Sequence, residues 1–502
     1  MFHNYITTSN RLSKKLYQLI ISRLDGEGIR SKSYQEEIVR LVEKGIGGFI
    51  IFGGKRDETR HFIDKIQSIS EKHLFIASDI ERGVGQQIQD ANIFPCQMAM
   101  SAAIDKTSTE DVKLLQSTVK AIADEAKDIG INMPLIPVLD VNQDPDNPII
   151  CTRAFSDNPE DVAWFGSEYI KILESSGLVS CAKHFPGHGD TSIDSHILLP
   201  VINKSLGDLM DTDIMPFKKA IYKGVSSIMI GHLSIPAIDN KPASLSKTIV
   251  TSLLRRELGF NGLIMTDALN MNALKDIEKV PIQCINAGVD ILLHPIDPDA
   301  VVEELISAVE SKEITEEQID RAVNRIEKKK VRLRNTERSE VNYEKHAKLS
   351  SQITHMSISL YKYTQGLLPI SDHNEVNVIC AGDSTLFQSS PLRSYFKNVS
   401  MLTDRIELNN KIPAFAIFTS VAAWKGSSGI DENEKDRIKE LIRKNKHSVV
   451  ISFGSPYVLK HFKEADILIA AYEAKEQTQR AVILCLEGRM DFKGHLPVKL
   501  NT

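Results

Sequence analysis

The run VSCAKHF (residues 179–185) is a short, apolar, β-rich segment that ends in a lysine, a histidine and a phenylalanine. Six further runs of this kind occur between residues 45 and 295, and longer amphipathic stretches separate them. Such an alternation predicts βα units and a parallel sheet. The six runs are GIGGFIIFGG (45–54), LFIASD (74–79), MPLIPVLD (133–140), SSIMIGHL (226–233), GLIMTDAL (262–269) and GVDILLHP (288–295).

Most of these runs end in polar or ionisable residues, which favours a closed barrel over an open sheet. In a barrel of parallel strands the reactive face lies at the C-terminal ends of all the strands, whereas an open doubly wound sheet gathers such residues at one switch point. We therefore predict an α/β fold with a (β/α)₈ TIM-type barrel. Seven strands are clear, and the eighth is expected in the helical-looking N-terminal region or as an irregular segment. The ionisable strand ends are Asp79, Asp140, Lys183 with His184, His232, Asp267 and His294.

A second alternation follows the barrel. Residues 300–345 have a strongly helical pattern, with a Thr-x-x-Gln capping sequence at Thr315. Beyond them, four more apolar runs predict a smaller three-layer αβα domain. We expect the barrel domain at residues 1–335, a linker at 336–360 and the second domain at 361–502. The four runs are VNVICAG (376–382), FAIFTS (415–420), SVVISFG (448–454) and ILIAAY (467–472).

Charge and hydropathy argue against a nucleic-acid-binding or membrane protein. Lys and Arg total 61 against 66 for Asp and Glu, and no long basic block is present. The short run Lys328 to Lys330 is expected to form a solvated helix face. No apolar run reaches the ~18 residues that span a bilayer. We therefore expect neither nucleic acid nor a membrane as a partner.

The cysteines and the N-terminal residues bear on the compartment. The six cysteines occur singly, without a C-x-x-C pair, so they indicate neither a disulfide framework nor a zinc site. Residues 1–26 are polar and charged throughout and lack the apolar core and cleavage site of a signal peptide. These features predict a reducing, cytoplasmic location.

The stretch KHFPGHGDTSIDSH (183–196) is the most informative one for chemistry. It places histidines and aspartates on a Gly/Pro-rich loop directly after a buried strand, and Gly187 gives the backbone the freedom that a functional loop needs. Asp194 and His196 are two residues apart, so in extended structure the carboxylate can hydrogen-bond the imidazole. Such a pair raises the basicity of the histidine and suits a general acid/base near neutral pH.

Two other interpretations of this loop remain open. An Asp-x-His pair can be an ordinary surface pair, although the loop and its other polar residues favour a functional one. His184, His188, Asp190 and His196 could also form a metal site, because imidazole and carboxylate are suitable ligands for zinc or iron. Neither a strand-end H-x-H nor an H-E-x-x-H helix is present. We expect no metal or other cofactor.

Asp267 closes the run GLIMTDAL, where a carboxylate could attack a substrate at the barrel mouth. Glycosidases need such a carboxylate to stabilise or trap an oxocarbenium-like centre. The alternative is that Asp267 caps a helix in the segment ALNMNALKDIE. Asp79 would supply an acceptor for sugar hydroxyls and Arg153 a fork of donors, and further donors come from Lys183 and His184.

These segments together resemble family 3 of the glycoside hydrolases, and within it the bacterial β-N-acetylglucosaminidase branch. The matching pieces span residues 45 to 275 in the family's order, and KHFPGHGDT…DSH is highly specific. The resemblance also extends to the trailing domain, which ends in GRMDFKGHLPVKLN. It implies a barrel, a carbohydrate substrate and peptidoglycan-recycling fragments as the natural candidates.

The resemblance also implies a role for each site residue. Asp267 is then the nucleophile that forms a glycosyl-enzyme intermediate, and His196, paired with Asp194, is the acid/base. One departure concerns the family's D-x-E-G-G-R-V-x-R, which reads here DIERGVGQQ (79–87). An arginine that the family often uses on the substrate is therefore replaced by Gln87 or displaced to Arg82. The residues that fall on positions for binding the terminal sugar are Asp79, Arg153, Lys183 and His184.

Several functions compete with the β-N-acetylglucosaminidase. In the same fold a β-glucosidase-type exo-glycosidase or an N-acetylglucosaminide phosphorylase is possible, because a histidine acid/base carries no negative charge to repel phosphate. Lys183 at a strand end could instead be the Schiff-base lysine of a barrel aldolase. A non-catalytic carbohydrate-binding role would leave Asp267 dispensable. The oligomeric state is left open.

Overall fold

The computed structural model places the chain in two compact units. One comprises Met1–Ile93, Gln116–Val141 and Pro159–His346, and the other Phe94–Leu115, Asn142–Asn158 and Ala347–Thr502. The residues that the structure describes are 11–195, 197–333, 338, 340–370, 375–388, 390–403, 406, 408, 411–421 and 428–500.

The first unit is built on eight parallel strands. Two sheets contain them, in the orders β10-β1-β2-β3-β4 and β5-β6-β9. Isolated parallel pairs, Val138 with Lys183 and Met265 with Ile291, join the two sheets at both edges. The strands therefore close into a ring, as the sequence predicts. They are β1 (Ile20–Asp25), β2 (Gly48–Phe52), β3 (Phe75–Ser78), β4 (Met133–Pro134), β5 (Cys181–Phe185), β6 (Ser227–Ile230), β9 (Leu263–Thr266) and β10 (Leu292–Leu293).

Strand β1 is the eighth strand, and it lies in the N-terminal region. A short helix at residues 11–17 and two turn residues precede it. The pairing of Ile20 with Leu292 and of Ile21 with Gly48 holds β1 between β10 and β2. The strand is thus fixed by partners distant in sequence, and for this reason the local pattern did not reveal it.

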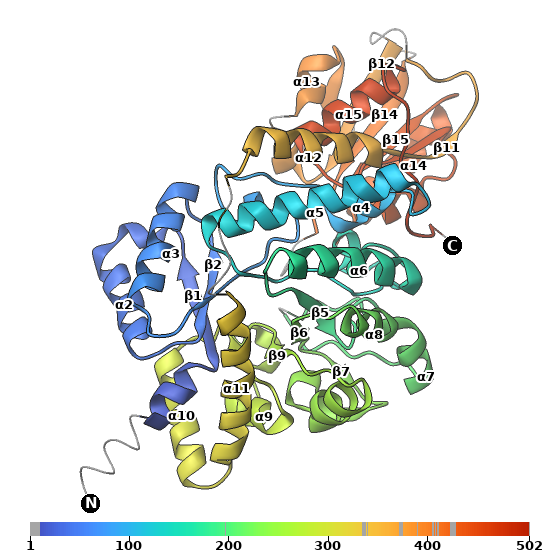
Figure 1. Cartoon of the computed structure of the whole chain (residues 1–502). Helices are drawn as coiled ribbons and strands as arrows, with labels where there is room; N and C mark the ends of the chain where they lie inside the picture. Colours follow the sequence, from blue (N-terminus) through green and yellow to red (C-terminus); the bar gives the residue numbers. More distant parts are fainter. Residues whose placement is uncertain are drawn as a thin grey trace, which may run out of the picture. The chain divides into compact units, whose positions relative to one another are not determined.

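Helices flank the barrel strands, and α2 and α3 can be seen beside β1 and β2 in Figure 1. Their bounds are α2 (Lys32–Glu43), α3 (Arg56–Ile69), α5 (Thr109–Ile129), α6 (Pro159–Ser175), α8 (Met215–Tyr222), α9 (Val280–Ala287), α10 (Pro298–Glu310), α11 (Glu316–Leu333) and the π-helix η6 (Thr248–Glu257). The predicted capping pattern is present at the start of α11, where Gln318 N donates to Thr315 Oγ1 at 3.3 Å and Thr315 N to Gln318 Oε1 at 2.9 Å.

The predicted solvated face at Lys328 to Lys330 is wrong for one of its members. Lys328 is exposed, but Lys330 is only 3% exposed. Three successive residues cannot share one face of a helix, because each turns by about 100°. Lys330 follows Ile326 by four residues and so falls on the buried stripe of α11.

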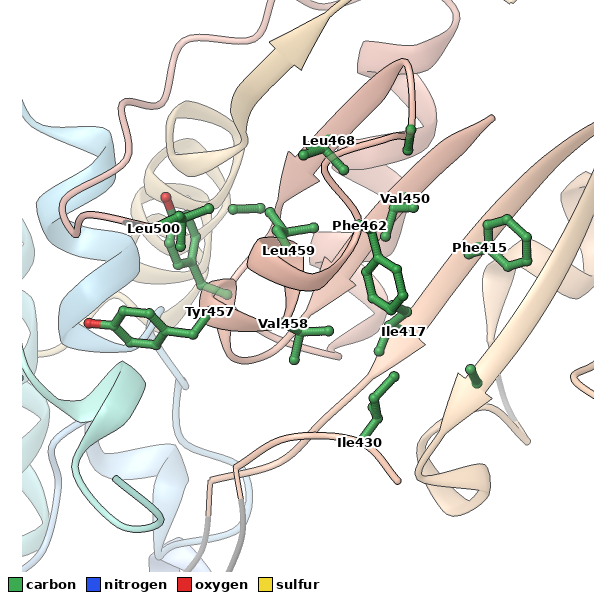
Figure 2. Packing of buried hydrophobic residues seen from close by; sticks show 14 of the residues in the cluster. Phe415, Ile417, Ile430, Val450, Tyr457, Val458, Leu459, Phe462, Leu468 and Leu500 are labelled. Carbon is green, nitrogen blue, oxygen red and sulfur yellow. The ribbon is translucent and has the colours of Figure 1, made fainter. Parts of the chain in front are cut away.

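The second unit is a three-layer αβα domain. Its sheet has the order β11-β16-β15-β14-β12-β13, in which only the β11–β16 pair is antiparallel. Apolar clusters cover both faces, and Figure 2 shows Phe415 and Ile417 of β14 in one of them. The strands are β11 (Ser359–Tyr363), β12 (Val376–Gly382), β13 (Val399–Met401), β14 (Ile412–Phe418), β15 (Val449–Phe453) and β16 (Ile467–Ala470).

Two segments from the first third of the chain belong to the second unit. One contains helix α4 (Gln97–Ala103), all of whose residues are buried, and Met98, Ala99 and Ala102 lie in the cluster of Figure 2. The range 336–360, proposed as a linker, contains the whole of helix α12 (Tyr343–Ser357). The domain limits 1–335, 336–360 and 361–502 remain a proposal.

Candidate active site

Lys183 lies near the end of β5 and is held by two carboxylates. Its Nζ is 2.7 Å from Asp79 Oδ1 and 2.8 Å from Glu81 Oε1, and the residue is only 1% exposed. Asp79 directly follows β3, so neighbouring regions of the barrel rim bring these side chains together. An ammonium held in this way is a charged hydrogen-bond donor, whereas a Schiff-base lysine reacts as the uncharged amine. The contacts therefore do not favour an aldolase.

His184 is held by the buried Asp140. Its Nδ1 is 2.7 Å from Asp140 Oδ2, and its backbone N donates to Asp140 Oδ1 at 3.2 Å. Burial would raise the pKa of Asp140, but His184 and His188 outweigh burial and hold this pKa below its usual value. An ionised Asp140 fixes the proton on Nδ1, so the other ring nitrogen of His184 is left for a ligand.

His188 adds a second, uncharged imidazole to this group. Its ring centroid lies 6.0 Å from that of His184, and its backbone N donates to Asp140 Oδ1 at 2.8 Å. Burial lowers the pKa of His188 to about 4, although Asp140 and Asp267 act in the opposite direction. Asp267 is therefore within electrostatic reach of this histidine.

Asp267 directly follows β9 and is partly buried. Its backbone N donates to Ile230 O of the neighbouring strand at 2.9 Å, and its Oδ1 accepts from Ala268 N at 2.8 Å. Turn residues follow it, and the next helical element is the short 3-10 helix η7 (Asn272–Leu274). Asp267 thus does not cap a helix at Ala268, and its carboxylate lies at the C-terminal end of a barrel strand.

Two further histidines follow barrel strands. His232 is buried after β6, with Nδ1 2.9 Å from Ser244 Oγ and Nε2 3.3 Å from Ala268 O, next to Asp267. His294 follows β10 and packs against Phe52, with ring centroids 5.7 Å apart. Burial lowers the pKa of His294, and Arg23 adds to this effect. Both imidazoles line the same rim of the barrel as Asp267.

The loop after β5 carries the sequence-predicted acid/base pair. Asp194 is buried, and its backbone O accepts from Ile197 N and Leu198 N, both at 3.0 Å. Asp194 is therefore linked to the described residues 197 and 198 by hydrogen bonds typical of a turn. His196 lies outside the residues that the structure describes, so the pairing with Asp194 remains a prediction.

Arg153 belongs to the second unit, unlike the other predicted sugar-binding residues. It ends the 3-10 helix η3 (Cys151–Arg153), its guanidinium donates to Ile149 O at 2.9 Å, and its backbone O accepts from Gln97 Nε2 at 2.9 Å. Its role in binding the substrate remains a proposal.

Two residues of the site were not assigned a role from the sequence. Glu81 is the second carboxylate on Lys183, and Asp140 is the partner of His184. A signal existed for both, because Glu81 is two residues beyond Asp79 and Asp140 ends a predicted strand. Among the residues that the structure describes, no three His, Cys, Asp or Glu side chains are grouped so as to hold a metal ion.

Comparison with known proteins places these features in a family. The model for the glycosyl hydrolase family 3 N-terminal domain matches residues 11–328. β-Hexosaminidase A of Pseudoalteromonas piscicida is 32% identical over 406 residues, which cover 72% of this chain and 67% of that protein.

Two solved structures are similar over nearly the whole chain. A family 3 β-N-acetylglucosaminidase from Paenibacillus sp. FPU-7 superposes with a TM-score of 0.82 at 26% identity and covers 97% of this chain and 99% of its own. The β-glucoside phosphorylase BglX bound to 2FGlc gives a TM-score of 0.85 at 25% identity, with 99% and 96% covered. The chain therefore belongs to glycosyl hydrolase family 3.

Proposed function

We propose that this protein is a retaining exo-glycosidase that removes terminal β-N-acetylglucosamine from small glycans. The observation that carries the proposal is the position of Asp267 at the end of β9, on the rim that also presents Lys183 with its two carboxylates and His184 with Asp140. Ionised and polar groups at one rim suit a hydroxyl-rich ligand, and one carboxylate there suits glycosyl transfer.

In the proposed reaction Asp267 is the nucleophile. Its carboxylate forms a bond to the anomeric carbon as the glycosidic C–O bond breaks, and His196 gives a proton to the leaving oxygen. In the second step a water attacks the anomeric carbon, His196 takes its proton, and the bond to Asp267 breaks. Asp194 holds the tautomer of His196 throughout.

The remaining residues bind the terminal sugar in this proposal. Lys183 donates to a hydroxyl, and Asp79, which it already contacts, accepts from one. His184 contributes its Nε2, since Nδ1 faces Asp140. Arg153 supplies the donor fork, and its test is the KM of an alanine variant.

The preference for N-acetylglucosamine rests on the relatives, because those at 32% and 26% identity are named as β-hexosaminidase and β-N-acetylglucosaminidase. We propose fragments of peptidoglycan in the cytoplasm as the natural substrate. In the part of the chain that the structure describes, no helix is both long and apolar enough to cross a membrane. Paired nitrophenyl β-glycosides of N-acetylglucosamine and glucose test the sugar preference.

The nucleophile assignment predicts that Asp267→Ala abolishes turnover of every glycoside, because the covalent route loses its nucleophile while the binding groups remain. Loss of at least about 10³-fold in kcat is expected, of the order found when a covalent nucleophile is removed. In the unaltered enzyme, a slowly hydrolysed fluorinated glycoside should label Asp267, which peptide mass spectrometry detects. Asp276→Ala, a few residues further along the chain, is the control. Near-normal turnover by Asp267→Ala contradicts the assignment.

A second candidate function is phosphorolysis, in which phosphate replaces water as the acceptor. It is favoured by the similarity to the β-glucoside phosphorylase, at 25% identity over almost the whole chain. The proposed histidine acid/base adds no negative charge that would repel the anion. Product analysis with and without inorganic phosphate decides between them, because only phosphorolysis yields a sugar 1-phosphate.

A further inference from the structure

Residues 186–214 link β5 to α8, and a lysine connects two distant parts of this β5–α8 loop. Lys204 Nζ lies 3.1 Å from Asp190 Oδ2 and 2.8 Å from Asp213 Oδ2. The lysine side chain is 12% exposed and that of Asp213 only 1%. Asp194 and the predicted acid/base His196 lie between Asp190 and Lys204 in the sequence. The stretch that contains Asp194 and His196 therefore lies between two residues, Asp190 and Lys204, that form an ion pair. We call the two ion pairs of Lys204 the Lys204 bridge.

Asp213 is a firm anchor for this bridge. It ends the π-helix η4 (Leu209–Asp213), one residue before α8 begins. Phe217 of α8 packs edge-to-face on Phe185 of β5, with ring centroids 5.2 Å apart. A Cβ added at Gly187 would lie 2.7 Å from Asp213 Cβ, so the backbone at the start of the loop runs directly against this aspartate. Both ends of the loop thus meet at Asp213.

The end of the same stretch has a separate attachment. Ser234 N donates to Pro200 O at 2.8 Å, and Ile202 N donates to Ser234 O at 2.9 Å. At the beginning of the stretch, the Asp190 carboxylate forms an ion pair with Lys204. Between these two attachments, residues 191–199 contain Asp194 and His196. The Lys204 bridge therefore sets where the first half of this segment lies.

The buried charges make a purely stabilising role for this bridge a poor explanation. Burial raises the pKa of Asp213 to about 6 despite the opposing effect of Lys204, and Asp190 and Asp140 act in the same direction as burial. Asp213 Oδ1 is buried without a hydrogen-bond partner among the described residues. Such a group costs free energy that an apolar contact would not, and fixing a geometry is one reason to retain it.

We propose that Lys204 is a positioning residue for proton transfer: by joining Asp190 to Asp213 it holds the segment 191–199 so that Asp194 and His196 reach the glycosidic oxygen. The inference rests on the proposed function, because it needs His196 as the acid/base. It assigns Lys204 no contact with the substrate. Its loss should affect the steps that need a proton and spare those that do not.

The test compares Lys204→Met with the wild type on two substrates. Hydrolysis of methyl β-N-acetylglucosaminide needs protonation of its leaving oxygen, and we expect its kcat to fall about 10–100-fold, as for loss of an orienting partner. For the 4-nitrophenyl glycoside, whose leaving group needs little help, kcat should fall far less, and added azide should restore deglycosylation. Lys204→Arg should recover most of the loss on the methyl glycoside.

Two controls separate the possible failures. Lys279→Met removes a lysine from an ion pair with Glu313 elsewhere in the unit and should leave both kcat values unchanged. Asp190→Asn removes only the ion pair with the more exposed carboxylate. It serves as the second test variant if Lys204→Met does not fold, and it should show the same dependence on the leaving group more mildly. Equal losses on both substrates in Lys204→Met or Asp190→Asn overturn the positioning role.

The His196→Ala variant distinguishes a failure of the positioning role of Lys204 from a failure of the proposed function. A strong leaving-group dependence in His196→Ala without one in the Lys204 and Asp190 variants overturns the positioning role alone. Equal losses on both substrates in His196→Ala overturn the acid/base assignment, and the positioning role with it. Matching patterns in all three variants support both.

Discussion

At the scale of single residues, the barrel rim is built from side chains that meet across strands distant in the chain. Lys183 and Asp267 lie at or near the ends of apolar runs, which makes their place on the rim predictable from the sequence. The pairing of His184 with Asp140, 44 residues apart, could not be inferred from either run alone. Which side chains meet depends on strand order and register, and local patterns do not contain that information.

The His188 imidazole predicts a stability that depends on pH. Its folded pKa of about 4 lies below the ordinary value of about 6.5, so between these values the unfolded chain binds a proton that the folded chain does not. Above pH 6.5 this histidine does not lower the free energy of unfolding. As the pH falls from 6.5 towards 4, the free energy of unfolding declines by on the order of 3 kcal/mol because of it.

His188→Asn should therefore reduce the fall in thermal midpoint between pH 6.5 and pH 4, because asparagine does not titrate. Scanning calorimetry at four or five pH values measures this slope. The exposed His61→Asn is the matched control and should keep the slope of the wild type. Parallel slopes in the wild type and the His188 variant would contradict a suppressed pKa.

At the scale of elements, the regular strands were predictable and the exceptions have physical causes. The predicted run 133–140 forms regular strand only at β4, because Pro137 lacks the N–H that a ladder needs. Strand β1 contains the polar Ser22 and Arg23 and is held by β2 and β10, so pairing rather than its own pattern makes it a strand.

Helix α11 yields a prediction about a buried lysine. Lys330 Nζ donates to Gln18 Oε1 at 3.0 Å and lies 5.1 Å from the centroid of the Phe75 ring. Burial lowers its pKa to about 7, from an ordinary value of about 10.4. Below pH 7 both the folded and the unfolded chain carry the charge, so the full cost of burying it is present. The cost declines as the pH rises from 7 to 10.4.

Lys330→Met should accordingly raise the free energy of unfolding by about 1–3 kcal/mol at pH 6, net of the lost bond to Gln18. At pH 10 the gain should nearly vanish. Denaturant titration of the two proteins at both pH values measures the difference. Lys328→Met, on the exposed side of the same helix, should change stability by less than about 0.5 kcal/mol. An equal effect of Lys330→Met at both pH values contradicts the prediction.

At the scale of the whole molecule, the sequence order of segments is not the order in which they pack. Helix α4 precedes β4 in the chain, yet its side chains complete a core whose sheet begins more than 250 residues later. A signal was present in the run QMAMSAA (97–103), because a helix that is buried all round needs partners on every side. The partners themselves could not be identified from the sequence.

This packing predicts how fragments at the proposed domain limits behave. A fragment of residues 1–335 keeps α4 but loses the sheet that buries Met98 and Ala102. A fragment of residues 361–502 keeps the sheet except for the first two residues of β11, and it exposes the apolar patch that α4 covers. Each buried apolar side chain contributes about 1–3 kcal/mol, so several together approach the whole stability of a domain. Neither fragment should unfold cooperatively on its own.

In the full chain, Met98→Ala isolates the same contact without truncation. It should destabilise the second unit by about 2–4 kcal/mol, because it leaves a cavity in a fully buried core. Calorimetry should show a lower midpoint for the transition of that unit, while Ile69→Ala, at a side chain 45% exposed on the barrel unit, should leave both transitions in place. A fragment of residues 361–502 that is monomeric and unfolds sharply at the midpoint found in the full chain would contradict the prediction. It would show that the sheet and its helices need no contribution from the segment 94–115, and the domain limits proposed from the sequence would then describe independent folding units.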